Sequence, residues 1–565
     1  MNIKAETPIA RKAEKVFEKR IVEWLENNHD NMPVKEVLFR ESYNEGYIVD
    51  VKESVAVVSA ASKIEFMAGA GELIRMITKA VCNDETPLND CSVANKAIFP
   101  QRTHYMPGHF GNAYEVCWPS EMEYLLEDLA LFGANGYADW VDPNDMPDPY
   151  NPHVFCSSSM SLWQKKKAYF RYAKELGMNT GLYFAHNVAF TDQLLPGLLG
   201  VRSHKHKVQG QVLCPSVPEA RQICLDNAEN LMKDFVASDV QIDKIICGPY
   251  DDGGCACDMC QPYYKTFLDM VYDIYKIVVK YFPAIQVDIC GWWTSDDELH
   301  LLKDFAKKLD GHFGEYMYSV TYGVFGVPEG VQHKISPLDL STFVHIGFSH
   351  ENKDTYIKTG IHNAQERIRS IVQSYEKAGC KGFNTYNESF GDHYNEYMIS
   401  RLARNPDAYL DELTLEYIYE MFSLKGEHAL RMLKIMNEMQ FYDLSKAGEW
   451  EKALLEIQPF IKVNEEQSLW LFEQVLLKAQ LMALDYQIGD YTKWKFKSDL
   501  DGVLPLIEQR EKFFGKMFRK VYGLGLMRHC FIPELMQAPW HKAYRKFYPV
   551  PLGNIVPGMK LNKNA

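Results

Sequence analysis

The feature that most constrains the fold is an alternation of strands and helices between Arg102 and Arg404. Short apolar segments alternate there with amphipathic helices, which is typical of βα units around a parallel sheet. We expect strands at residues 109–116, 133–140, 179–186, 243–250, 286–293, 314–323, 341–350 and 380–388. We expect helices at residues 120–132, 161–176, 216–237, 263–281, 296–309 and 363–378. Eight units in about 300 residues, without a G-x-G-x-x-G turn, predict an α/β fold of the (β/α)8 TIM-barrel type rather than an open sheet.

The segments on either side of this alternation have different patterns. Residues 1–97 contain an amphipathic helix at 11–28, strand-like runs at 34–40, 46–52 and 54–60, and then GAGELIRMITKAV. They predict a small N-terminal α/β domain. Residues 406–565 carry apolar stripes at helical spacing and predict a C-terminal helical domain. The barrel is therefore expected at residues 98–405.

Charge and hydropathy argue against two classes of partner. The 61 Lys and Arg against 75 Asp and Glu give a formal net charge of -14, which disfavours nucleic acid. No apolar run is as long as a membrane helix, and the charged N-terminal segment contains no signal-peptide core. Thirteen cysteines in a long chain favour reduced thiols. We expect a cytoplasmic protein unless a signal peptide before Met1 has been removed, and leave open a homo-oligomer.

The strongest candidate for chemistry is the segment ICGPYDDGGCACDMC at residues 246–260. Asp251 and Asp252 follow the fourth expected strand, where barrel enzymes place catalytic groups. Adjacent side chains on an extended turn point to opposite sides, so one carboxylate can orient the substrate while the other protonates a leaving oxygen. The alternative is a solvated acidic loop that caps the next helix.

The same segment carries Cys255, Cys257 and Cys260 in a C-x-C-x-x-C arrangement. Three thiolates and a fourth ligand can hold structural zinc, but a second CxxC is absent from the sequence. Cys247 or a histidine would complete the set only through folding. We therefore expect free thiols, with no metal and no cofactor, and keep zinc as the alternative.

A second acidic segment, FNTYNESFGDHYNEY, occupies residues 383–397. Glu388 follows the eighth expected strand and is expected to face the first pair across the barrel mouth. Two carboxylates about 5 to 9 Å apart on opposite sides of a sugar ring suit glycosidic cleavage. The alternative is an exposed Glu on a loop that enters a helix.

Aromatic, histidine and arginine side chains near other expected strand ends complete the predicted site. Flat rings suit the C–H faces of sugars, and His and Arg can bind hydroxyls or a carboxylate. Each alone is more often a structural residue, so the prediction depends on their joint placement. The expected substrate-binding residues are Arg102, His104, His109, Trp140, His186, Tyr250, Trp292, Trp293, Tyr322, His350 and Tyr386.

Three segments resemble a known group of glycoside hydrolases over roughly residues 40–425. YIVDVKESVAVVSAASKIEFMAGAGELIRMI is similar to the small α/β domain before the barrel in β-N-acetylhexosaminidases and α-glucuronidases. The pair Asp251-Asp252 resembles the hexosaminidase Asp-Glu or Asp-Asp pair, and GGCACDMC is similar to segments of uncharacterised relatives. TYNESFGDHYNEYMISRLARNPDAYLDELTLEYIYEMF resembles the strand-eight segment of α-glucuronidase-like hydrolases.

The resemblance implies roles for the three carboxylates. Asp252 would be the general acid, although the hexosaminidases more often have Glu there, and Asp251 would orient an N-acetyl group or support the acid. Glu388 would be the nucleophile, base or ring-stabilising carboxylate, although Asn387-Glu388-Ser389 replaces the usual Ser-Glu-Gly.

The sequence thus predicts an exo-acting glycoside hydrolase whose partner is a carbohydrate. Its terminal sugar would be a uronide, an N-acetylhexosamine or a neutral sugar, with the uronide favoured because Tyr386-Asn387-Glu388 is closer to the glucuronidase pattern. One alternative is a non-catalytic carbohydrate-binding barrel. The other is a metal-dependent hydrolase or lyase that uses the cysteine cluster.

Overall fold

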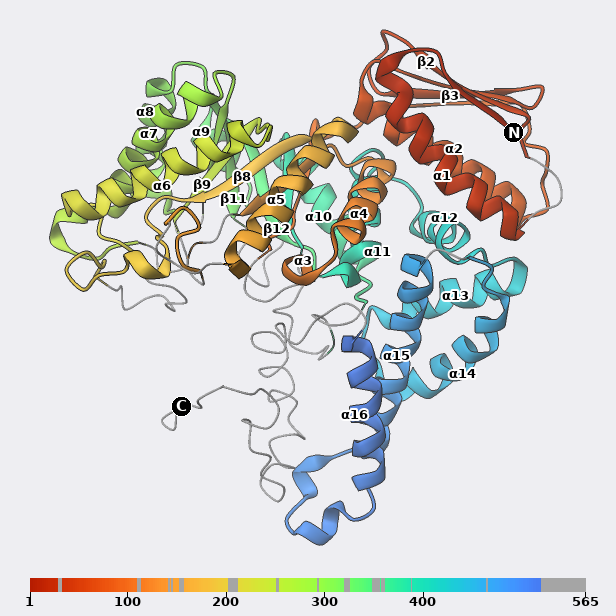
Figure 1. The fold of residues 1–565 in the computed structure, drawn as a ribbon. Helices are drawn as coiled ribbons and strands as arrows, with labels where there is room; N and C mark the ends of the chain where they lie inside the picture. Colours follow the sequence, from red (N-terminus) through yellow and green to blue (C-terminus); the bar gives the residue numbers. More distant parts are fainter. Residues whose placement is uncertain are drawn as a thin grey trace.

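The middle of the chain forms a closed barrel of eight parallel strands in the order β10-β11-β12-β13-β6-β7-β8-β9. Figure 1 labels four of these strands, β8, β9, β11 and β12, with helices around them. The computed structural model describes residues 1–28, 33–108, 113–140, 143, 146–151, 157–201, 212–249, 254–291, 294–319, 326–347, 356, 361–387, 389–463 and 466–519. The barrel strands are β6 (Gln101–Tyr105), β7 (Gly136–Trp140), β8 (Asn179–Ala185), β9 (Lys244–Gly248), β10 (Gln286–Cys290), β11 (Phe313–Ser319), β12 (Asp339–His345) and β13 (Gly382–Tyr386). The predicted (β/α)8 barrel is confirmed.

Helices follow the barrel strands along the chain, as the alternation predicts. They are α3 (Ala113–Val116), α4 (Pro119–Phe132), α5 (Ser157–Leu176), α6 (Pro218–Ala237), α7 (Tyr263–Tyr281), α8 (Leu299–Lys308), α9 (Val331–Ile335), α10 (Gln365–Ala378) and α11 (His393–Leu402). Each of the predicted barrel helices overlaps one of these.

The prediction of the first barrel strand was wrong. The expected strand at 109–116 contains α3, whereas the chain enters the barrel earlier, at β6. The sequence QRTHY has no apolar run. Gln101 and Tyr105 point into the barrel, whereas Arg102 and His104 face outward and form hydrogen bonds there. Hydrophobic periodicity therefore could not reveal this strand.

The N-terminal segment forms a mixed five-stranded sheet in the order β1-β2-β4-β3-β5, with helices on one face (Figure 1). Its elements are β1 (Asn2–Ala5), α1 (Arg11–Asn28), β2 (Glu36–Glu41), β3 (Tyr47–Lys52), β4 (Val55–Ala60), α2 (Lys63–Cys82) and β5 (Cys91–Asn95). The three central strands and α1 match the predicted segments. The edge strands β1 and β5 were not predicted.

Helix α2 lies between this sheet and the helices of the barrel, and two glycines allow it to contact both. A Cβ atom on Gly69 would lie 2.7 Å from a side-chain carbon of Val58 in the sheet. A Cβ atom on Gly71 would lie 2.0 Å from the backbone oxygen of Leu131 in α4. Because residues two apart in a helix lie on nearly opposite faces, each glycine fits one neighbour of α2.

The C-terminal segment is helical, as its apolar stripes predict. Its main helices are α12 (Leu410–Phe422), α13 (Gly426–Met439), α14 (Ala447–Ile457), α15 (Glu466–Ile488) and α16 (Leu504–Arg519). Helix α12 packs against α2, so the C-terminal helices also contact the N-terminal segment. Among the described residues, no helix is both long and apolar enough to cross a membrane.

The interior of the barrel contains a buried ionic cluster. Lys244 Nζ donates to Asp288 Oδ2 at 2.7 Å and to Gln101 Oε1 at 2.7 Å, and it lies 3.5 Å from Glu315 Oε1. Two carboxylates thus share one ammonium group. Burial, followed by the charge of Asp288, raises the pKa of Glu315 to about 7.

We expect Gly71→Ala to lower the free energy of unfolding by about 2 kcal/mol, because the methyl group would collide with the backbone of α4. The matched control is Gly448→Ala in α14, where nothing lies within 4 Å of the added carbon. That control should be neutral or stabilising by up to about 1 kcal/mol, since alanine favours helices. Urea unfolding followed by circular dichroism measures both effects, and equal effects would contradict the tight contact.

The folded-state pKa of Glu315 lies above the unfolded-state value, so the folded protein binds the extra proton between these two values. The contribution of Glu315 to stability is therefore complete below about pH 4.5 and is lost as pH rises through about 7. We expect Glu315→Gln to flatten the fall in stability between pH 5 and pH 8, measured by urea unfolding. The control Glu376→Gln, at an exposed position, should show the same pH dependence of the free energy of unfolding as the parent. If this dependence were the same in all three proteins, Glu315 would not be its source.

Candidate functional site

Aromatic side chains point inward near the C-terminal ends of the barrel strands. We call this group the aromatic floor; it consists of Tyr105, Trp140, Tyr183, Phe343 and Tyr386. The rings of Tyr105 and Tyr183 stack with centroids 3.9 Å apart, and the centroids of Tyr105 and Tyr386 are 5.6 Å apart. Trp140 and Tyr386 had been predicted from their positions at strand ends, and the structure brings both into this one cluster.

Tyr183 and Phe343 belong to the floor although sequence reasoning did not select them. Both lie two residues before the last residue of their strands, in register with the other inward side chains. The period of two along β8 and β12 was the signal that would have identified them. Burial raises the pKa of the Tyr183 hydroxyl well above its usual range, so this ring stays neutral.

The two acidic segments follow strands on opposite sides of the barrel. Strand β9 ends at Gly248, three residues before Asp251, and β13 ends at Tyr386, two residues before Glu388. Three strands separate β9 from β13 in each direction around the barrel. Several predicted site residues lie outside the described part of the chain: Asp251, Asp252, Glu388, His109, Tyr250, Trp292, Trp293, Tyr322 and His350.

Arg102 and His104 do not face the interior of the barrel, so we withdraw them from the predicted site. The Arg102 guanidinium donates to Phe99 O at 2.7 Å and to Gly133 O at 2.6 Å, and is 2% exposed. His104 is buried beneath α11, with Nε2 3.1 Å from Ser400 Oγ. Burial lowers the pKa of His104 to about 3, so the ring is neutral. Both residues support the barrel wall.

His186 was also expected to bind substrate, but it is turned toward α7. It is fully buried, its Nε2 is hydrogen-bonded to the Tyr263 hydroxyl, and its ring centroid lies 4.8 Å from that of Phe267. Burial lowers the pKa of His186 to about 3. Strand β8 ends at Ala185, which points inward, so the next side chain points outward. His186 therefore supports the loop after β9 through Tyr263.

A buried hydrogen-bond network holds the end of β13 in place. Thr385 Oγ1 donates to Asn387 Oδ1 at 2.5 Å and lies 3.0 Å from His104 Nδ1. The Asn387 amide donates to Glu396 Oε1 in α11. Burial and the nearby Asp392 raise the pKa of Glu396 well above its usual range. A neutral carboxyl of α11 thus orients the residue that precedes Glu388.

The cysteine motif gains a fourth member in the folded chain. The sulfur atoms of Cys214, Cys255, Cys257 and Cys260 all lie within 4.8 Å of one another. Cys247, considered as a fourth ligand, is instead buried within β9 and belongs to the main hydrophobic core. Every cysteine in the described part of the chain is a free thiol. These four thiols are the described residues best able to hold a metal.

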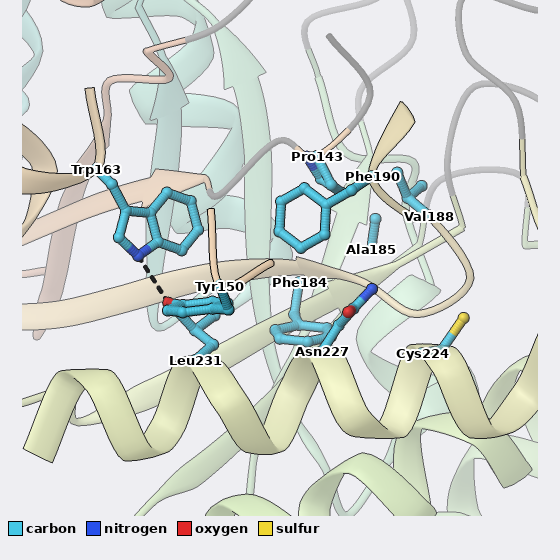
Figure 2. A pocket seen from close by; sticks show the side chains of 10 residues that line it. All are labelled: Pro143, Tyr150, Trp163, Phe184, Ala185, Val188, Phe190, Cys224, Asn227 and Leu231. Atoms are coloured by element: carbon cyan, nitrogen blue, oxygen red, sulfur yellow. Dashed lines mark hydrogen bonds between the residues drawn. The ribbon is translucent and has the colours of Figure 1, made fainter. Parts of the chain in front are cut away.

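A small cavity of about 30 Å³ lies outside the barrel, between β8 and α6. Figure 2 shows Trp163 and Phe190 in the upper part of the view, and Phe184 beside Asn227 and Cys224 of α6. It has room for roughly one water molecule, far less than a sugar ring needs. We assign it no part in substrate binding.

No protein-family model matches the sequence, and no curated protein matches it. Solved structures do match. A family 89 glycoside hydrolase from Clostridium perfringens has a TM-score of 0.62 and 12% sequence identity, covering 98% of this chain and 76% of that chain. A family 138 glycoside hydrolase targeting pectin rhamnogalacturonan II has a TM-score of 0.55 and 10% identity, covering 91% and 73%.

A family 20 exo-β-N-acetylglucosaminidase from Vibrio harveyi has a TM-score of 0.51 and 9% identity, covering 78% of this chain and 74% of that chain. The fold is shared with glycoside hydrolases. At this level of identity the likeness concerns the fold, and it extends over most of each chain, beyond the barrel alone.

We expect Glu396→Gln to change the free energy of unfolding by less than about 1 kcal/mol, since it replaces a neutral carboxyl group with a neutral amide of the same shape. Glu396→Ala should cost about 2 to 3 kcal/mol, because it opens a cavity and leaves the Asn387 amide without its acceptor. Urea unfolding at pH 7 compares the two. An equal loss in both variants would mean that Glu396 is ionised.

Proposed function

We propose that this protein is an exo-acting glycoside hydrolase that removes a terminal sugar at the mouth of the barrel. The observation that carries the proposal is the position of the two acidic segments, which follow β9 and β13 on opposite sides of one barrel. In barrels of this type, the C-terminal ends of the strands carry the catalytic groups. The likeness in fold to glycoside hydrolases of three families supports the same reaction class.

In the proposed mechanism, Asp252 protonates the leaving glycosidic oxygen as the bond to the anomeric carbon breaks. Asp251 orients the substrate, and Glu388 acts from the opposite side as nucleophile, as base for an attacking water, or as stabiliser of the positively charged ring. Tyr183 and Tyr386, the two partly exposed rings of the aromatic floor, offer apolar surface against which a sugar ring can pack. An acid close to apolar walls such as Trp292 or Trp293 would have its pKa raised toward neutrality, which suits proton donation.

The terminal sugar is proposed to be a uronide, an N-acetylhexosamine or a neutral sugar. The sequence of the β13 segment favours the uronide. The Clostridium perfringens family 89 enzyme binds GlcNAc-α-1,4-galactose as its substrate. N-acetylglucosaminides are therefore candidate substrates as well. The role of Asp251 would separate N-acetylhexosaminides from the other sugars, because only a 2-acetamido group can act as an internal nucleophile that Asp251 would orient.

The experiment is a screen of aryl glycosides, including uronides and N-acetylhexosaminides of both anomers, followed by variants assayed on the best substrate. We expect Asp252→Asn and Glu388→Gln each to reduce kcat/KM at least about 100-fold with the circular dichroism spectrum unchanged, since general acid catalysis alone contributes roughly 10²- to 10⁴-fold. The exposed Asp258→Asn, on the same loop, should keep parental activity.

The outcomes separate the rival functions. Parental rates in both variants would exclude these carboxylates from the chemistry. Sugar binding without turnover, unchanged in Asp252→Asn, would instead indicate a carbohydrate-binding barrel. Loss of activity in Asp251→Asn on N-acetylated substrates, together with inhibition by a thiazoline, would assign the N-acetylhexosaminidase branch. A mild effect of Asp251→Asn would favour a uronide or a neutral glycoside.

A further inference from the structure

Two segments that are far apart in sequence bring four cysteines together. Cys214 lies just before α6, and the other three lie in the turn after β9 and in the short 3-10 helix Asp258–Cys260. The Cys214 sulfur is 3.6 Å from that of Cys255, 3.8 Å from that of Cys257 and 3.8 Å from that of Cys260. A disulfide requires about 2.05 Å between sulfurs, so Cys214 is bonded to none of the others, and all four are free thiols.

We propose that these four thiolates bind one zinc ion in a structural site. Zinc binds thiolate sulfur at about 2.3 Å in tetrahedral geometry, which places the ligand sulfurs about 3.8 Å from one another. The three separations from Cys214 match this spacing, and no pair among the four sulfurs is more than 4.8 Å apart, so small side-chain adjustments would complete the tetrahedron. A closed set of four sulfurs leaves no open coordination position, which is typical of a structural rather than a catalytic zinc.

The surroundings of the sulfurs also suit a metal thiolate. The backbone N–H of Val201 donates to Cys255 Sγ at 3.2 Å, and Ser216 Oγ lies 2.9 Å from Cys260 Sγ. Such hydrogen bonds offset the negative charge that thiolates bring to a zinc site. Cys255 and Cys260 are buried, whereas Cys257 is partly exposed, so an ion can enter from its side.

The site joins the loop between β8 and α6 to the loop between β9 and α7. These loops already meet through the backbone, because Ala256 N donates to Val201 O at 2.8 Å. Tyr263 packs against the cysteines and is hydrogen-bonded to His186 at the end of β8. Bound zinc would therefore fix the chain that begins three residues after Asp252, without taking part in the reaction itself.

The test is metal analysis of the full-length protein, purified under reducing conditions without chelators. We expect about one zinc per chain in the parent and in Cys91→Ser, which changes an exposed cysteine far from the cluster. Cys257→Ser, chosen because its side chain is partly exposed, should hold at least about five-fold less zinc. Its melting temperature should fall to that of the chelator-treated parent.

A second measurement keeps the test decisive if Cys257→Ser fails to fold. Parent protein produced with Co(II) should show sulfur-to-cobalt charge-transfer bands and the visible bands of a tetrahedral ion. Parent protein without zinc and without cobalt bands, iron in place of zinc, or full zinc retention in Cys257→Ser would each overturn the proposal. These readouts do not depend on glycoside turnover, so failure of the zinc site and failure of the proposed function are distinguishable.

Discussion

The pairing of β13 with β6 is the constraint on which the rest of the structure depends, because it closes the barrel. Gly382 pairs with Gln101 and Tyr386 with Tyr105, joining residues that are 281 positions apart in the sequence. A Cβ atom on Gly382 would lie 2.1 Å from the backbone oxygen of Gln101, so the close approach needs glycine. This closure completes the aromatic floor and places the end of β13 opposite the end of β9.

Much of the fold could be predicted from the sequence, because most barrel strands bury apolar residues on both faces and stand out as apolar runs. Strand β6 could not, since Arg102 and His104 face outward and satisfy their polar atoms through Gly133, Phe99 and Ser400. The edge strands β1 and β5 could not be predicted either, because few of their side chains are buried and neither strand has a marked apolar face.

The site was harder to predict, because a side chain's direction depends on the last residue of its strand. The expected third strand ended at His186, whereas β8 ends one residue earlier, and a shift of one residue moves a side chain to the other face. Trp140 and Tyr386 are the last residues of their strands, and both point inward as expected. Cys214, the fourth cysteine of the cluster, lies 41 residues before Cys255, so the local spacing of cysteines could not predict that it belongs there.

Helix α2 is shared between two partners, with Gly69 against the sheet and Gly71 against α4. Inserting a single residue before this pair would turn both glycines by about 100° and move them about 1.5 Å along the axis. Larger side chains of α2 would then meet Val58 and Leu131. Among related sequences, the part of α2 up to Gly71 should therefore keep its length even where neighbouring loops gain or lose residues, and an alignment with a gap inside residues 63–71 should be regarded as misplaced.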